Sequence, residues 1–158
     1  MLVMNIRLTE MIESDIDEVL EIERASFPFP WSKKMFLNEL SNPNSRIILA
    51  KGESDEILGF ICFWNVAGEI HILNLAVHPG HRRQDIGKRL LTHVIESSIA
   101  NGAGLFALEA RSRNTTAISF YKSFGFKKVG LRKEYYADTG DDAVLMDLEL
   151  NIDKQTLN

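Results

Sequence analysis

A short basic segment, residues 82–88, lies where a predicted strand passes into a predicted helix. Apolar residues at helical spacing begin at Ile86, three positions after the arginine pair Arg82 and Arg83. The first turn of a helix leaves backbone N–H groups without intrahelical partners, and the helix dipole adds positive potential there. An isolated arginine pair is more often a solvated turn. The strand-to-helix context instead favours a site for a phosphate group.

Other reactive residue types predict no chemistry of their own. The 4 histidines include one close pair, His78 and His81 near Asp85, and this is not a compact metal motif. We therefore expect no metal requirement. The single cysteine, Cys62, lies in the apolar run 57–64, so it is expected to be a buried thiol rather than a nucleophile.

The elements that position the basic segment follow from hydrophobic periodicity and from capping residues. We expect a helix after Ser14, a second after Ser32 that ends before Pro43, a third over residues 87–100, and a fourth over residues 114–124. Strands are expected over residues 5–8, 46–50, 57–66, 69–77, 105–110, 127–135 and 143–150. The sequence thus predicts a mixed α/β structure with an open central sheet that includes an antiparallel meander.

Length and charge restrict the class of protein. The chain has 158 residues, 45% hydrophobic and 25% charged, which suits one domain over residues 1–150 with a polar tail over 151–158. No apolar run approaches the about 20 residues of a membrane helix, and the N-terminus lacks a signal pattern, so we expect a cytoplasmic protein without membrane contact. The net charge of −4 disfavours nucleic acid and suits a cationic peptide.

Several segments together carry a resemblance to a known family. Residues 74–91 resemble the acetyl-coenzyme A signature of the GNAT superfamily. Residues 22–25, 30–32, 108–114, 117–126, 132–136 and 141–143 resemble the RimI-type ribosomal protein alanine N-acetyltransferases. The similarity extends over nearly the whole chain, from about Ile6 to Leu150.

This resemblance implies a fold and an activity. The fold would be the α/β (α+β) GNAT fold, with a mostly antiparallel sheet of about seven strands, about four helices, and two splayed strands that form the acetyl-coenzyme A cleft. The activity would be direct transfer of an acetyl group from acetyl-coenzyme A to a protein's N-terminal amine in a ternary complex. The implied acceptor is the basic N-terminal peptide of small ribosomal subunit protein eighteen, which begins with alanine.

The resemblance also implies a set of coenzyme-binding residues. Backbone groups of Leu75, Ala76 and Val77 would pair with the pantetheine arm. Asn114 can cap its own helix, and in the family the matching asparagine also contacts the coenzyme. The pyrophosphate would be surrounded by Arg82, Arg83, Gln84, Asp85, Ile86, Gly87 and Lys88.

Asp85 departs from the family pattern, which has glycine at this position. A carboxylate about 4 Å from a phosphate would cost about 1 kcal/mol in a water-like dielectric and several in a shielded site. Alternatively, Asp85 stabilises the N-terminus of its helix by up to about 1 kcal/mol. The sequence leaves these two interpretations open.

Acetyl transfer to an amine needs a proton acceptor for the amine and a proton donor for the leaving thiolate. Glu109 ends a predicted strand and Tyr121 lies on the helix that follows, a spacing that matches the RimI pattern. Taken alone, a glutamate at a strand end is more often a solvated surface residue, and a tyrosine on an apolar helix is more often a core residue. Jointly, they are the expected base and acid.

The acceptor groove is expected where relatives shape it, at acidic and aromatic side chains that suit a basic peptide. These residues are Glu23, Trp31, Tyr135, Tyr136, Asp141 and Asp142. Two rival interpretations stay open: an acetyltransferase for a small-molecule amine, because acceptor sites vary within the superfamily, and a non-catalytic acyl-coenzyme A binding module.

Overall fold

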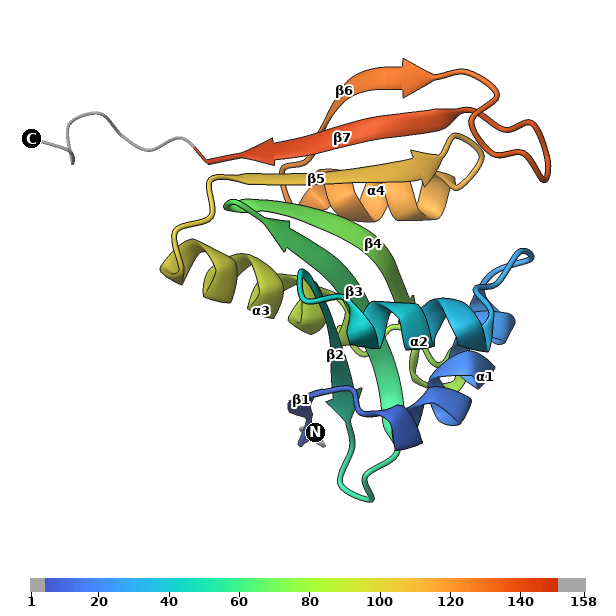
Figure 1. Cartoon of the computed structure of the whole chain (residues 1–158), viewed down its shortest axis with the longest axis vertical. Helices are drawn as coiled ribbons and strands as arrows, with labels where there is room; N and C mark the ends of the chain where they lie inside the picture. Colours follow the sequence, from blue (N-terminus) through green and yellow to red (C-terminus); the bar gives the residue numbers. More distant parts are fainter. Residues whose placement is uncertain (1–4, 151–158) are drawn as a thin grey trace, which may run out of the picture.

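The computed structural model describes residues 5–150 and contains one seven-stranded sheet in the order β1-β2-β3-β4-β5-β7-β6 (Figure 1). The polar tail expected over residues 151–158 lies outside the described residues. The strands are β1 (Arg7–Glu10), β2 (Ser45–Lys51), β3 (Ile57–Val66), β4 (Glu69–Val77), β5 (Leu105–Arg111), β6 (Lys127–Arg132) and β7 (Ala143–Glu149).

The sheet is mixed and mostly antiparallel, as expected. β2, β3 and β4 form the predicted antiparallel meander, while β4 and β5 pair in parallel. The β3–β4 hairpin turns at Ala67 and Gly68, both with positive φ (52° and 84°), which is the backbone of a type I′ turn. Such a turn matches the right-handed twist of the two strands it joins.

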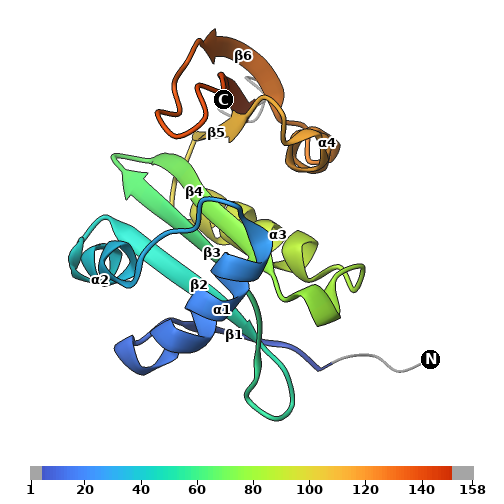
Figure 2. The same ribbon diagram turned by 90° about the vertical axis from the view of Figure 1, so that its right-hand side faces the viewer.

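In the described part of the chain, four α-helices cover the sheet on both faces (Figure 2). α1 (Ile16–Ser26) and α2 (Lys33–Ser41) pack on one face, and α3 (Ile86–Ala100) and α4 (Thr115–Ser123) pack on the other. Each face of the sheet has its own hydrophobic core, and alternate residues of β2 point into one or the other. Ile47 packs on the α1–α2 side and Ile48 packs on the α3 side. Short 3₁₀ turns, η1 (Glu13–Asp15) and η2 (Pro79–His81), precede α1 and α3.

The feature that positions the site is a splay between β4 and β5. Their pairing begins at Glu69 and Leu105 and stops at Ile72 and Leu108. There β4 is bulged, because Cys62 and Phe63 of β3 face Asn74 and Ile72, which leaves Leu73 without a partner. A bulge bends its strand and increases the local twist, so the two strands diverge beyond it.

The structure confirms some of the helix caps and element boundaries that the sequence predicts, and differs from others. Ser32 accepts the Met35 backbone N–H at 3.3 Å and Asn114 accepts that of Ala117 at 3.1 Å, so both predicted caps form. Ser14 does not cap α1, because it lies inside η1. The last strand before the long loop is also shorter than predicted: Glu134 has φ 51°, which breaks the extended backbone after β6.

Candidate active site

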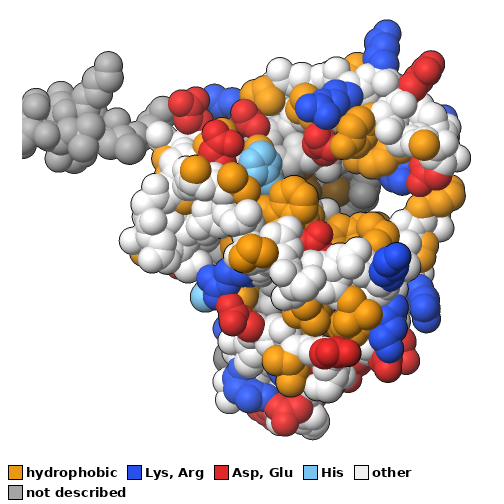
Figure 3. Space-filling view, viewed as in Figure 1, with side chains coloured by type: hydrophobic (Ala, Val, Ile, Leu, Met, Phe, Trp, Pro, Cys, Tyr) orange, Lys and Arg blue, Asp and Glu red, His pale blue; other side chains and the backbone are white. Residues whose placement is uncertain are grey.

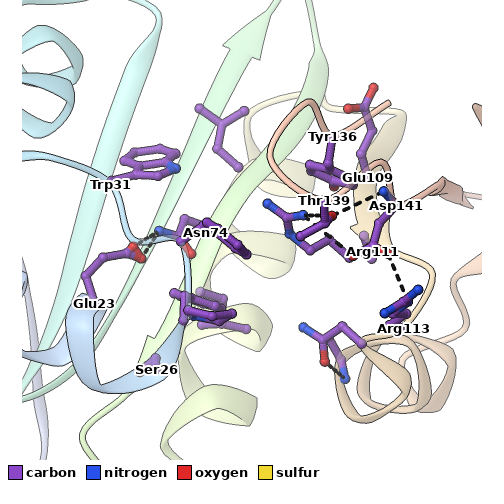
Figure 4. Close-up of a pocket in the computed structure, with 18 of the residues that line it drawn as sticks. Glu23, Ser26, Trp31, Asn74, Glu109, Arg111, Arg113, Tyr136, Thr139 and Asp141 are labelled. Carbon is purple, nitrogen blue, oxygen red and sulfur yellow. Dashed lines mark hydrogen bonds and ion pairs between the residues drawn. The ribbon is translucent and has the colours of Figure 1, made fainter. Parts of the chain in front are cut away.

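A cavity of about 550 Å³ opens at the splay between β4 and β5 (Figure 4). Its walls come from the end of α1, the α1–α2 loop, β4, β5, α4 and the β6–β7 loop. Glu23 and Asn74 lie on one side of it, and Glu109, Arg111 and Tyr136 on the other. Elements distant in the sequence therefore meet around one cavity.

The two predicted catalytic residues both line this cavity. Tyr121 is 8% exposed, and its ring packs against Phe120 and Phe126. Burial raises the pKa of its phenol above the ordinary value of 10.0, so the hydroxyl is protonated at neutral pH. The Glu109 side chain is 35% exposed, and its Oε1 lies 3.7 Å from Nη1 of Arg132. The arrangement places a protonated donor and an accessible carboxylate on the same cavity.

The β4 edge beside the cavity can hold a peptide-like ligand. Beyond Ile72, the backbone groups of β4 that face β5 have no strand partner, and Leu75 lines the cavity. The pantetheine arm of acetyl-coenzyme A contains two amides that can pair with such an edge, so the residues present fit the coenzyme. The Ala76 side chain is 5% exposed and packs in the α1–α2 core, and its backbone groups face Phe60 of β3. The residues of this stretch that turn their backbone groups to the free edge are therefore Leu75 and Val77.

The basic segment lies at the N-terminus of α3, as predicted, outside the cavity itself. Nη2 of Arg82 donates to the Ser26 hydroxyl at 3.3 Å and links this segment to α1. The side chains of Arg83, Gln84 and Lys88 are exposed, whereas that of Ile86 is buried in the core. Exposed cations and the free N–H groups of a 15-residue helix remain available to an anion.

Asp85 adopts the left-handed conformation, with φ 59° and ψ 22°. Glycine is the residue that takes this conformation without strain, which explains physically why the family pattern has glycine here. The exposed Asp85 side chain makes no capping hydrogen bond with α3. Any favourable effect of the carboxylate on the helix therefore acts through the dipole alone.

The predicted acceptor residues divide into three groups. Glu23, Trp31, Tyr136 and Asp141 line the cavity. Tyr135 lies instead on a neighbouring hollow, which Tyr136 also lines. Asp142 lines neither space, and its carboxylate accepts the Glu134 backbone N–H at 2.9 Å within the β6–β7 loop, so its place on the groove stays a prediction.

Glu23 is the one charged residue buried among residues 5–150, at 0% exposure. The Nδ2 of Asn74 donates to both its carboxylate oxygens, at 2.6 and 2.7 Å. Loss of hydration raises the pKa of Glu23 to about 7, although hydrogen bonds from Asn74 and the Trp31 backbone oppose this rise. The carboxyl group joins α1, the bulged part of β4 and the α1–α2 loop at one point.

Sequence reasoning did not single out Arg111, which connects the loops over the cavity. Its guanidinium donates to both Asp138 carboxylate oxygens, at 2.8 and 2.6 Å, and to the Thr139 hydroxyl at 3.1 Å. It also lies 4.0 Å from the ring centroid of Tyr136 and 5.3 Å from that of Phe29. The residues next to Arg111 in the sequence do not indicate these contacts, because its partners come from two distant loops.

The remaining reactive side chains have local roles. Cys62 is fully buried, as expected, and burial raises the pKa of its thiol to about 12. His78 accepts the Gly80 backbone N–H at 3.0 Å within η2. Residues 5–150 contain no group of three potential metal ligands. Over the same range, no helix has both the length and the apolar character that a membrane span requires.

Comparison with known proteins identifies the family. The Acetyltransferase (GNAT) family model matches residues 16–126. The ribosomal protein bS18-alanine N-acetyltransferase of Haemophilus ducreyi is 35% identical over 144 residues, 89% of this chain and 97% of that protein. The enzyme of the same name from Escherichia coli is 30% identical over 148 residues, covering 92% and 98% of the two chains.

The fold comparison agrees with the sequence comparison. The crystal structure of the ribosomal-protein-S18-alanine N-acetyltransferase from Escherichia coli matches with a TM-score of 0.86 and 28% identity, over 98% of this chain and 99% of that one. The family model covers both splayed strands, β4 and β5, and the relatives and the solved structure cover most of the chain. On these grounds the chain belongs to the acetyltransferase (GNAT) family.

Proposed function

We propose that this protein transfers the acetyl group of acetyl-coenzyme A to the N-terminal α-amine of a protein, and that its acceptor is the N-terminal alanine of ribosomal protein bS18 in the cytoplasm. The observation that carries the proposal is the splay cavity, where a free strand edge, the Glu109 carboxylate and the Tyr121 phenol come together. The names of the 35% and 30% identical relatives support the acceptor.

The coenzyme enters along the free edge of β4, with its pyrophosphate at the N-terminus of α3. Backbone groups of Leu75 and Val77 at the free edge hold the pantetheine arm, while those of Ala76 pair with β3. A backbone N–H near Val77 polarises the thioester carbonyl. The Asn114 cap lies on the cavity wall, where it can contact the same arm.

Glu109 accepts the proton of the α-ammonium group, directly or through one water molecule. The neutral amine then attacks the thioester carbon and an N–C bond forms. As the C–S bond breaks, the nitrogen releases its second proton to water, and water returns a proton to the Tyr121 oxygen after this residue has acted as the acid. The Tyr121 hydroxyl gives its proton to the leaving thiolate, so coenzyme A departs as the thiol. The acetyl group passes directly between the two substrates in a ternary complex.

Acidic and aromatic side chains around the acceptor side suit a cationic N-terminus. Glu23 and Asp141 line the cavity with Trp31 and Tyr136, and Asp141 accepts from Nε of Arg113 at 2.9 Å. A small-molecule amine would use little of this wall. A protein N-terminus would use it over several residues.

A peptide panel tests the proposal. Peptides that begin with alanine, serine or methionine, and the same alanine peptide with a blocked amine, are compared for acetyl transfer, with the bS18 N-terminal sequence as reference. We expect turnover of the free alanine peptide and none of the blocked one. Acetylation of blocked peptides alone, or of polyamines in preference to every peptide, would overturn the assignment.

A further inference from the structure

A second, larger hollow lies beside the cavity, on the sheet face that α1 and α2 leave uncovered. It has a volume of about 840 Å³ and extends across β3, β4, β5, β7 and β6. Figure 3 shows this face, where hydrophobic and acidic side chains gather next to one another. The helices α3 and α4 cover the opposite face of the same strands.

The floor of this hollow is made by strand register. His71 of β4, Ala107 of β5 and Asp147 of β7 lie side by side, because Ala107 pairs with both neighbours. The methyl side chain of Ala107 leaves space between larger groups on either side. Val129 and Val66, which border that space, are 59% and 45% exposed. A depression that has apolar side chains in its walls, and that no element of residues 5–150 covers, can receive an apolar side chain.

The hollow is continuous with the splay cavity. Leu73, Glu109 and Tyr136 line both spaces. A polypeptide whose N-terminal amine reacts near Glu109 can therefore extend over the face of β5 into the hollow. A small-molecule acceptor would not reach it.

The charge of the hollow favours a basic polypeptide. Glu69, Glu109 and Asp147 line it, against the single guanidinium of Arg132. Arg132 lies 3.7 Å from Glu109, and His71 lies 3.5 Å from Glu69. Asp147 takes part in no ion pair within residues 5–150.

We propose that this hollow, here called the Ala107 groove, is a second binding site for the acceptor polypeptide, beyond the residues held at the splay cavity. It receives one large apolar side chain over Ala107, and a neighbouring lysine or arginine of the acceptor pairs with Asp147. The inference rests on the proposed transfer to a protein N-terminus and specifies how much of the acceptor the enzyme reads. Burial of one apolar side chain and one added ion pair suffices for about a tenfold effect on affinity.

The test compares two acceptor peptides with the same first three residues, one of three residues and one of ten with apolar and basic residues after the third. We expect the longer peptide to have a KM about tenfold lower, with similar kcat. Ala107→Phe fills the floor and should remove this advantage while leaving the KM values of the short peptide and acetyl-coenzyme A unchanged. Asp147→Lys should do the same for long peptides that carry a basic residue.

Val129→Lys is a milder test of the groove, because the position is exposed and the substitution preserves folding. Ile99→Lys is its matched control, since Ile99 lies on α3, away from the groove, and is 42% exposed. Equal KM values for short and long peptides would overturn the inference, as would an Ala107→Phe effect of equal size on both. Turnover of the short peptide reports on the proposed function alone, so the two proposals can fail separately.

Discussion

Replacing the buried carboxyl of Glu23 by an amide should change how stability depends on pH. Glu23 is 0% exposed and its pKa lies near 7 rather than at 4.5. A raised carboxyl pKa means that folding favours the protonated form, so its stabilising effect is complete below pH 4.5. It is lost as the pH rises from 4.5 through about 7, because the unfolded chain releases the proton first.

The pKa change from 4.5 to about 7 corresponds to about 3 kcal/mol of unfolding free energy. Glu23→Gln keeps the size of the side chain and removes the titration, and Asn74 can rotate its amide to offer an acceptor to the new NH₂ group. We expect the variant to be similar to or less stable than the parent at pH 4.5 and more stable at pH 8. For a chain of 158 residues, 3 kcal/mol corresponds to roughly 6–12 °C in Tm.

Urea unfolding of parent and variant at several pH values between 4.5 and 8 measures this difference. Glu21→Gln is the matched control, since Glu21 lies exposed on the same helix and its substitution removes the same charge. The control should follow the parent at every pH. Parallel pH profiles for the parent and Glu23→Gln would show that the buried carboxyl is not the group whose titration weakens the fold.

Three further substitutions test the site. Tyr121→Phe should lower kcat at least about tenfold with little change in acetyl-coenzyme A affinity, in steady-state assays with calorimetric binding; unchanged turnover would remove its role as acid. Asp85→Gly relieves a left-handed residue and removes a negative charge, so it should raise coenzyme affinity several-fold by calorimetry; no gain would leave repulsion without support. Arg111→Lys loses the bidentate contact with Asp138, so it should raise the KM for the acceptor about tenfold and leave the KM for the coenzyme unchanged. Equal effects on the two KM values would contradict a role confined to the acceptor loops.

Asp85 illustrates how far a pattern in the sequence can be interpreted. The family pattern marks the position as unusual, and two electrostatic interpretations remain possible from the residue type alone. The structure adds the backbone angle of φ 59°, which identifies a conformational reason for glycine that neither interpretation contained. Residue type alone carries no information about φ at one position in a turn.

The sequence by itself determined the local elements: the caps at Ser32 and Asn114, the antiparallel meander, and the basic turn before α3. These depend on spacing and capping over a few residues. Only the tertiary structure decided what the site consists of. The bulge at Leu73 sets the splay, Glu23 meets Asn74 across 51 positions, and Arg111 meets Asp138 across 27. Such contacts depend on strand register and loop path, and the basic turn before α3 has a cavity beside it only because β4 bends away from β5.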